Sequence, residues 1–469
     1  MQLATLAQHI RDKEISPVEV THDVLKRIHS LNPILNAYGT VLEEQALEDA
    51  KAAEREIMSG VYRGPLHGVP IGLKDLIFTK GIRTTMGSKV YANFVPEENA
   101  TVVERIRDAG GIVLGKLNMD EFAYGSTGDK SYFGPVKNPF NISKISGGSS
   151  SGAGAAVVSE LCYGAIGTDT GGSIRIPSSC CGIIGLKPTF GRVSKFGVYP
   201  LSYTLDHVGP MTRFVKDNAI VLGIIAGCDK KDPYSYAEFE DFTRLMNDSI
   251  KGATIGVPSN FFFEQIDSQV AKALQHTISV FQDLGANIRS VTIPQIQTMS
   301  WGQVMIQTSE TYAIHESTLQ THATDLDVEI KQQLLTCAST RGYDYVKATQ
   351  QKDQTTVEIN QIFDEVDILL TPTVPILPTD TNQREIQIGN VTYKVNTTLL
   401  RFTLPWSYTG NPCLSIPCGF SEDGLPIGMQ LVGRTNEEAQ LYRFGYWFEQ
   451  TSGVLDEREA LLAHVFQTQ

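Results

Sequence analysis

Apolar residues recur at helical spacing through the first sixty positions of the chain. The run SPVE at 16–19 is a capping box with proline at the first helical position, and apolar residues then recur every fourth position up to Ile28. A second helical stretch covers 43–60 and ends in Gly60, a residue suited to the left-handed turn that stops a helix. We therefore expect a layer of helices at the N-terminus.

From Leu66 to about Gly223 the pattern changes to short apolar runs separated by glycine-rich turns. These runs are GVPIGLKDLIF, AGGIVLGK, YGAIGTDTGG and CGIIGLKP. Thr101 and Glu104 form another capping box before VVERIRDAGG, so helices alternate with the predicted strands. This alternation predicts an α/β fold in which helices cover both faces of a sheet.

The second half of the chain shows the same alternation of predicted helices and strands. Apolar residues from Val270 to Phe281 predict an amphipathic helix, and VDILLTP and GMQLVG predict buried strands. The polar stretch 376–394 lacks periodicity and predicts a long loop or a hairpin. Neither a fixed-period repeat nor a low-complexity linker interrupts the chain, which favours one continuous domain.

The composition of the chain disfavours several classes of binding partner. The chain has 39 Lys and Arg against 52 Asp and Glu, a formal net charge of −13, which disfavours direct binding of nucleic acid. Its seven cysteines lack paired spacing and read as reduced thiols, mostly in the core. The sequence has no secretory signal pattern and no long apolar span, so we expect a soluble cytoplasmic protein without membrane contact. With no cluster of metal-ligand residues, we expect neither a metal nor another cofactor.

Two motifs of other enzyme classes fit poorly. Gly110 to Lys116 matches the phosphate-loop pattern, but Leu117 replaces the hydroxyl residue that holds magnesium, and the interior reads as a strand. Ser150 occupies the nucleophile position of a GSSSG elbow, but the preceding segment VKNPFNISKISG does not read as a strand. His67 and His207 are the serious candidates for its base, and each reads more readily as a turn residue.

The string TGGS at 170–173 raises a question about nucleophilic chemistry. Two glycines permit successive backbone N–H groups to point one way, which suits an oxyanion hole. Those N–H groups belong to Thr170, Gly171, Gly172 and Ser173. A serine nucleophile also needs a base, and Lys74 lies in an apolar run where burial would lower its pKa. Pairing with Asp75 is the alternative for Lys74, and Lys187 has a similar context.

The segment ISGGSSSGAGAA, followed by GTDTGGSIRIPSSCCGIIGLKPT, resembles the amidase signature family. The likeness extends to PLHGVPIGLKDLI, AGGIVLGKLNMDEFAYGS and GNPCLSIPCGF with GLPIGMQLVG, and it thins between about 230 and 400. It implies one α/β domain over 1–469 with a mixed sheet between helices. Within it, 1–62 forms the helical N-terminal layer, 65–223 the core with the catalytic residues, and 224–469 the rest of the sheet and the substrate pocket.

The resemblance also implies a triad of Ser173, Ser149 and Lys74, with a cis peptide bond before Ser149. Ser173 would attack an amide carbonyl while Ser149 passes its proton toward neutral Lys74 and returns a proton to the departing amine. Water would then cleave the acyl-enzyme by the same relay, with the oxyanion held by the N–H groups of 170–173.

Three neighbouring residues complete the expected site. Asp169 and Arg175 flank the nucleophile and are expected to pair and hold its turn, and Ser150 is expected to support Ser149 by a hydrogen bond. Ser151 stands where the family usually has glycine, but the two serines before it are intact.

The expected function is hydrolysis of a small carboxylic amide to an acid and an amine or ammonia, through a seryl acyl-enzyme. A similar family member is the glutaminase A subunit of a tRNA-dependent amidotransferase, which carries an arginine pair and an acidic residue for the ends of glutamine. This chain has Gln332, Gln333 and Leu400 at those places. Because buried charges need partners, we expect a neutral or weakly polar amide and a stand-alone enzyme. The alternatives are this glutaminase, a hydrolase of a carbamate or acylurea, and a family member that has lost catalysis and serves as a binding or assembly protein.

The sequence identifies the residues that line the substrate pocket less clearly than it identifies the triad. Family members are often dimers, which leaves a homodimer open. Aromatic or flexible candidates for the pocket are Met119, Tyr124, Trp301, Tyr312 and Trp406, although such residues more often belong to the core.

Overall fold

An eleven-stranded mixed sheet runs through the computed structural model, which describes residues 1–236 and 239–468. Strands β3, β2 and β6 are parallel to one another, as are β11, β9 and β10, whereas the strands between these two groups pair antiparallel. In order across the sheet the strands are β1 (Tyr38–Val41), β3 (Ile112–Leu117), β2 (Pro70–Lys74), β6 (Gly164–Asp169), β8 (His207–Thr212), β7 (Ile184–Lys187), β14 (Cys413–Phe420), β15 (Pro426–Val432), β11 (Ile368–Pro372), β9 (Thr254–Pro258) and β10 (Asn287–Val291).

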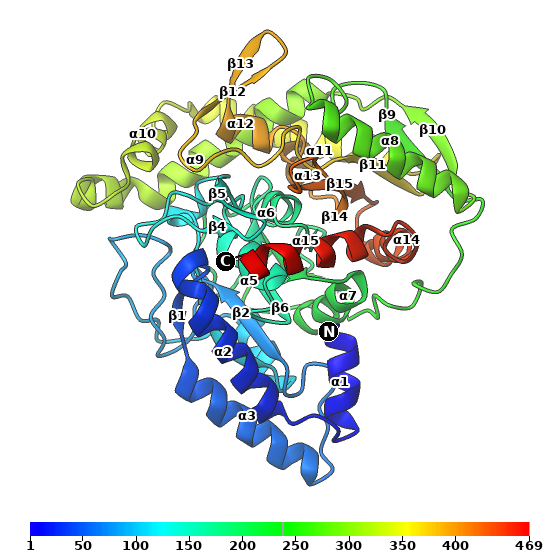
Figure 1. The fold of residues 1–469 in the computed structure, drawn as a ribbon. Coiled ribbons are helices and arrows are strands. Elements are labelled where there is room, and N and C mark those ends of the chain that lie inside the picture. Colours follow the sequence, from blue (N-terminus) through cyan, green and yellow to red (C-terminus); the bar gives the residue numbers. More distant parts are fainter. Residues whose placement is uncertain (237–238, 469) are drawn as a thin grey trace.

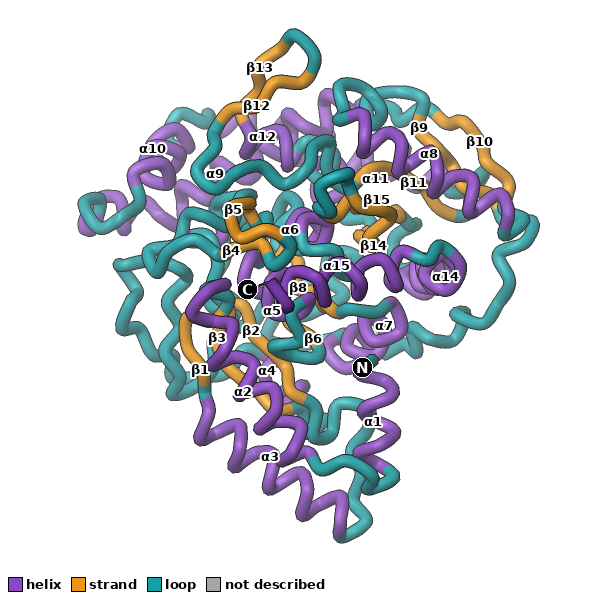
Figure 2. The backbone as a smooth tube through the Cα atoms, in the orientation of Figure 1, coloured by secondary structure: helices purple, strands orange, loops and turns teal. Residues whose placement is uncertain are grey.

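Both faces are buried over most of this sheet, as its near-continuous apolar strands require, whereas the edge strand β10 is largely exposed. Ala165 and Ile166, successive residues of β6, belong to two different hydrophobic cores, and so do Val113 and Leu114 of β3. The helices that cover the faces and extend the fold are α1 (Leu3–Arg11), α2 (Pro17–Leu35), α3 (Glu43–Met58), α4 (Thr101–Asp108), α5 (Ser151–Val158), α6 (Arg175–Cys180), α7 (Val215–Ile225), α8 (Ser268–Asp283), α9 (Ile296–His322), α10 (Val328–Cys337), α11 (Gly342–Ile362), α12 (Val395–Leu400), α13 (Leu404–Thr409), α14 (Glu438–Thr451) and α15 (Val454–Thr468). The predicted α/β sheet between helices is confirmed (Figure 2).

The N-terminal helices gather at one end of the molecule, in blue in Figure 1. Ser16 caps α2 as predicted, because its hydroxyl accepts hydrogen bonds from the N–H groups of Val18 and Glu19. Helix α3 ends before Gly60, whose φ of 95° lies in the left-handed region. The layer is not wholly helical, however, because the short strand β1 pairs with β3 at the edge of the sheet.

The second predicted capping box is wrong. Thr101 is the first residue of α4 and not its cap, and its hydroxyl donates to Asp229 at 2.6 Å. A side chain 128 positions away therefore takes the hydrogen bond that the local pattern would have used for the helix N-terminus.

Two small antiparallel hairpins lie outside the main sheet. The polar stretch 376–394 contains a loop followed by the hairpin of β12 (Glu385–Ile388) and β13 (Val391–Lys394), which projects from the top of the molecule in Figure 1. The other joins β4 (Lys137–Asn138) to β5 (Asn141–Ile145), so the segment before Ser150 does contain a short strand, contrary to expectation. In the described part of the chain, no helix is both long enough and apolar enough to cross a membrane.

Candidate active site

Lys74 ends strand β2 in the interior of the protein, and its side chain is fully buried. Because β2 and β6 are parallel neighbours, their carboxyl ends lie at the same edge of the sheet. The Lys74 ammonium group donates to the hydroxyls of Ser149 and Thr168, each at 2.8 Å. Asp75 takes hydrogen bonds from Thr85 instead, so the alternative pairing of the lysine with Asp75 is not formed.

Burial lowers the pKa of Lys74 from its usual value to about 7, although Asp120, Asp169 and Asp206 oppose this shift with their negative charges. A substantial fraction of this lysine is therefore neutral at neutral pH. A neutral amine at this position has a lone pair with which to accept a proton from the Ser149 hydroxyl.

Ser149 follows a cis peptide bond from Gly148 and immediately precedes Ser150, the cap residue of α5. The hydroxyl of Ser150 donates to the carbonyl of Thr168 at 3.2 Å and accepts from the N–H of Thr168 at 3.3 Å. The expected hydrogen bond from Ser150 to Ser149 is thus absent among the described residues. Ser150 instead fixes the main chain of Thr168, the second hydroxyl partner of Lys74.

In the turn after β6, residues 170–173, the carbonyl groups accept hydrogen bonds from the protein, whereas the backbone N–H groups donate none to the described residues. Thr170 O accepts from Gln303 Nε2 at 2.8 Å, Gly171 O from Thr403 Oγ1 at 2.5 Å, and Ser173 O from Ser150 N at 3.1 Å. By contrast, the N–H groups of residues 170–173 have no acceptor within the described chain. Unpaired amide donors on one turn are chemically suited to stabilise an oxyanion.

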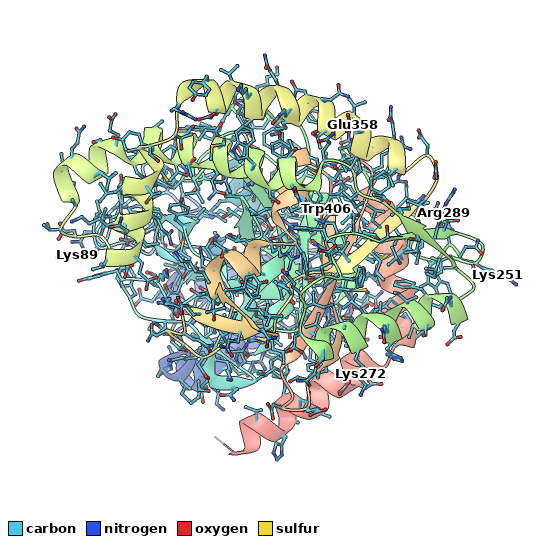
Figure 3. All side chains as sticks on the ribbon, turned by 90° about the horizontal axis from the view of Figure 1, so that it is seen from above. Lys89, Lys251, Lys272, Arg289, Glu358 and Trp406 are labelled. Carbon is cyan, nitrogen blue, oxygen red and sulfur yellow. The ribbon has the colours of Figure 1, made fainter. Side chains whose placement is uncertain are left out.

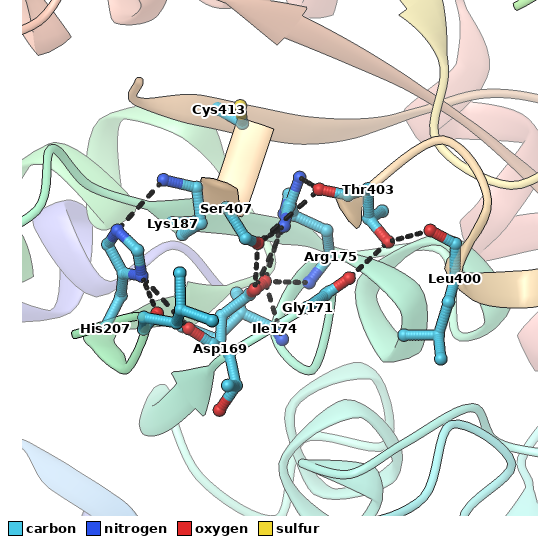
Figure 4. Close-up of polar contacts among 12 residues, drawn as sticks. Asp169, Gly171, Ile174, Arg175, Lys187, His207, Leu400, Thr403, Ser407 and Cys413 are labelled. Atoms are coloured by element: carbon cyan, nitrogen blue, oxygen red, sulfur yellow. Dashed lines mark hydrogen bonds and ion pairs between the residues drawn. The ribbon is translucent and has the colours of Figure 1, made fainter. Parts of the chain in front are cut away.

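A buried ion pair holds this turn in place (Figure 4). The Arg175 guanidinium binds both carboxylate oxygens of Asp169 at 3.0 Å, and neither side chain is exposed to solvent. Burial alone would raise the pKa of Asp169, but the Arg175 charge holds it below its usual value. Asp169 also accepts from the N–H of Ile174, so the expected pairing of Asp169 with Arg175 is formed and closes the turn.

Ser173 sits at the end of this turn with a 5% exposed side chain. Its main chain is joined to the Ser149 segment through the hydrogen bond from Ser150 N. The Ser173 hydroxyl has no hydrogen-bond partner among the described residues, and it is not bonded to the Ser149 hydroxyl in this structure. The structure therefore brings Lys74 and Ser149 into direct contact and Ser173 beside them.

The competing residues are engaged elsewhere. Lys187 contacts Pro188 O and His207 Nε2, and burial lowers its pKa to about 8, but it reaches neither serine. The other ring nitrogen of His207 faces the carbonyls of Asp169 and Leu205. His67 instead contacts Arg63 and Glu56.

The two remaining classes of site find no support either. Lys116 of the phosphate-loop string lies in strand β3, as the sequence predicts, with its amine on Ile77 O. Within the described residues, no group of three His, Cys, Asp or Glu side chains is placed to hold a metal ion.

A pocket of about 570 Å³ opens beside the turn, between α9, α10 and the 384–404 segment. Three of its side chains lie against Gly171: a methyl group built there would be 2.9 Å from Leu404 Cδ2, 3.4 Å from Leu400 Cδ2 and 3.7 Å from Gln307 Oε1. Gln332 and Gln333 also line this pocket. The three positions at which the sequence departs from a glutamine-binding pattern therefore share one cavity.

Of the aromatic and flexible candidates, Tyr124 lines this pocket. Trp406 is buried against Phe262 instead, with ring centroids 5.3 Å apart, and lies well inside the molecule in Figure 3. Met119 is likewise core, whereas Trp301 is 37% exposed and does not line the pocket.

Sequence reasoning missed Thr168 and Gln303. Thr168 precedes Asp169 in the run GTDTGG, so the strand period offered a signal that its hydroxyl lies near the strand end. Gln303 lies more than 130 residues beyond the turn that it holds, in the part of the chain where the resemblance is thin, and no local pattern marks it.

Comparison with known proteins places this architecture in a family. The model of the family described as Amidase matches residues 19–442. The A subunit of the glutamyl-tRNA(Gln) amidotransferase of Geobacter sp. (strain M21) is 39% identical over 469 residues, which cover 95% of this chain and 96% of that one.

Two solved structures extend the likeness to the fold. A chain described as part of an unexpected vestigial protein complex, which reveals the origins of an s-triazine catabolic enzyme, matches with a TM-score of 0.93 at 30% identity, covering 96% of this chain and 98% of that one. A bacterial aryl acylamidase of the amidase signature family matches with a TM-score of 0.90 at 27% identity, covering 98% of each chain. The chain belongs to the amidase signature family, and it is an amidohydrolase that acts on C–N amide bonds.

Proposed function

We propose that this enzyme hydrolyses a neutral carboxylic amide through an acyl-enzyme on Ser173, with Ser149 and Lys74 as its proton relay. The observation that carries the proposal is the buried contact of Lys74 with Ser149 beside a turn of unpaired amides. A base with a pKa near 7 and a preformed oxyanion site are the two things that a serine nucleophile requires.

The reaction follows from these positions. Ser173 Oγ bonds to the amide carbon while its proton passes to Ser149, whose own proton passes to Lys74. The carbonyl oxygen takes up negative charge against the N–H groups of 170–173. The C–N bond then breaks as the same relay returns the proton to the leaving nitrogen. Water adds to the acyl carbon by the same path and releases the acid.

The charges of the pocket support a neutral substrate. Lys130 pairs with Glu329, and Arg384 pairs with Glu329 and Asp129 at 2.7 and 2.9 Å, so two cations face two anions. Glu385 and Lys394 are exposed on opposite strands of the hairpin at the rim. The cavity therefore offers no spare buried charge for either end of a free amino acid.

A second candidate is the glutaminase component of a tRNA-dependent amidotransferase, which the 39% identity to such a protein favours. Both candidates use the same nucleophile, and they differ in the amide that enters. Ammonia release from glutamine, compared with release from uncharged amides of similar size, separates them. A clear preference for glutamine would overturn the neutral-amide proposal.

Labelling with a fluorophosphonate tests the nucleophile without a known substrate. We expect one adduct, on Ser173, located by peptide mass spectrometry, and much slower labelling of Lys74→Ala. Lys187→Met is the matched control, because Lys187 is equally buried but contacts neither serine. An adduct on Ser150, or no adduct on protein shown to be folded by circular dichroism, would contradict the proposal.

A further inference from the structure

The pocket wall contains a carboxamide that no part of the protein uses. Gln307 lines the cavity from α9 and makes no side-chain hydrogen bond with the described residues. One helical turn earlier, Gln303 donates to Thr170 O at 2.8 Å, which fixes the register of α9 over the turn. Gln307 is therefore held next to Gly171, two residues from the proposed nucleophile.

The other neutral polar side chains of the wall are mostly occupied. Their hydroxyls and amides are hydrogen-bonded to protein atoms in Tyr124, Thr127, Thr308, Thr336, Asn396 and Thr397. Gln332 and Gln333 are unpaired like Gln307, but Gln307 is the one of the three that lies against Gly171. Among the neutral polar side chains that line the pocket, Gln307 is thus the one that both lacks a protein partner within the described chain and lies against the turn.

Two leucines flank this carboxamide on the same side of the turn. Leu404 and Leu400 lie closer to Gly171 than Gln307 does, and α13, which begins at Leu404, packs against α9. A ligand group at this place meets two apolar side chains and one carboxamide, which presents both an acceptor oxygen and donor hydrogens.

We infer that Gln307 selects substrates whose acyl part carries a second neutral amide or urea group, one or two carbons from the scissile carbonyl. This inference rests on the proposed function, because it takes the pocket to be the amide site. A group of this kind offers one donor and one acceptor side by side, so it pairs with the carboxamide at two points. An alkyl group would displace water from the carboxamide without replacing its hydrogen bonds, and a carboxylate would find Lys130 and Arg384 already paired.

Binding to the Ser173→Ala protein tests the selection apart from turnover. Malonamide, isovaleramide and malonamate have nearly the same shape and differ in the group at the far end. Succinamide, 4-methylpentanamide and succinamate repeat the set with one more methylene. We expect the diamide to bind about tenfold more tightly than its alkyl counterpart in at least one set, the difference that one hydrogen bond makes. The carboxylate of that set should bind more weakly than the diamide.

Substitutions of Gln307 test whether this side chain causes the difference in affinity. Gln307→Leu, and the closely matched Gln307→Met, should bring the affinity of the diamide down to that of the alkyl amide and leave the alkyl amide unchanged. Gln320→Leu, an exposed glutamine on the same helix, is the control and should keep the difference. Equal binding of diamide and alkyl amide in both sets, or a difference that survives both Gln307 substitutions, would overturn the inference.

Hydrolysis and labelling by the wild-type protein report on the proposed function separately. Labelling of Ser173 together with equal binding of both amides would support the proposed function and contradict the inference about Gln307. Discrimination between the amides through Gln307 without any labelling of Ser173 would support the inference and contradict the proposed function.

Discussion

Thr168 Oγ1 accepts a hydrogen bond from Lys74 Nζ at 2.8 Å, the same distance that separates this nitrogen from Ser149 Oγ. Two hydroxyl groups therefore hold the Lys74 amine, and its orientation toward Ser149 depends on the contact with Thr168 as well. Thr168 itself is fixed through its main chain by Ser150. Three hydroxyl residues and one lysine thus form a single buried cluster.

Replacing Thr168 with valine keeps the shape of the side chain and removes one of the two anchors of the lysine. We expect kcat to fall about tenfold with little change in KM, the effect of one lost hydrogen bond. Steady-state kinetics on any hydrolysed amide measures this, and Thr168→Ser should restore most of the rate. A change confined to KM would show that Thr168 acts on substrate binding instead.

The rate should depend on pH through Lys74. Its pKa is lowered to about 7, and its protonated form has no lone pair for a proton from Ser149, so activity should be low in acid and rise with a midpoint near pH 7. The kcat/KM profile of the free enzyme and the rate of fluorophosphonate labelling should share this limb. A labelling rate that stays constant from about pH 5 to about pH 9, a range that brackets a base with a pKa near 7, would exclude a base of this kind.

Asp169→Asn should destabilise the protein and the turn together. It leaves the fully buried Arg175 guanidinium without its negative partner, which costs about 3–5 kcal/mol of unfolding free energy. Urea unfolding measures the loss. Because the pKa of Asp169 is held below its usual value, the pair contributes its stability above the unfolded pKa and loses it as the pH falls through the folded pKa. A substitution that leaves stability unchanged at neutral pH would show that the turn does not need the pair.

Gly172→Ala should abolish the oxyanion site without touching any reacting side chain. The new methyl group would lie 2.4 Å from Thr403 Oγ1, at a φ of 147° that side chains rarely adopt. Because the turn must shift, we expect kcat to fall by about 10²–10³, as for the loss of an oxyanion donor. Circular dichroism should show a folded protein, and a variant with normal kcat would contradict the assignment of the turn.

Much of the sheet could be predicted from the sequence because its strands are short apolar runs bounded by glycine. The strands predicted from VDILLTP (366–372) and GMQLVG (428–433) are confirmed as β11 and β15. The helix predicted from Val270 to Phe281 is confirmed as α8, because its apolar residues recur at helical spacing. Strand β1 was missed because four residues with a glycine carry almost no pattern, and it exists through its pairing with β3.

The choice of base could not be made from burial. Lys74 and Lys187 are both fully buried, and burial lowers the pKa of each. They differ in the side chains that their amines contact, a serine and a threonine for Lys74 and a histidine for Lys187. That difference depends on the order of strands across the sheet, which apolar periodicity does not encode.

The contacts of Arg175 have a consequence for how the protein is made. Its guanidinium donates to Thr403 O, Ser407 Oγ and Gln430 Oε1, and strand β7, which follows it, pairs with β14. The turn that bears Ser173 is thus completed by residues more than 200 positions downstream. Such distant pairings slow folding and leave intermediates exposed. A growing chain therefore completes the turn that bears Ser173 only after β15 has been synthesised, and fragments that stop before residue 430 should be inactive even where their helices form.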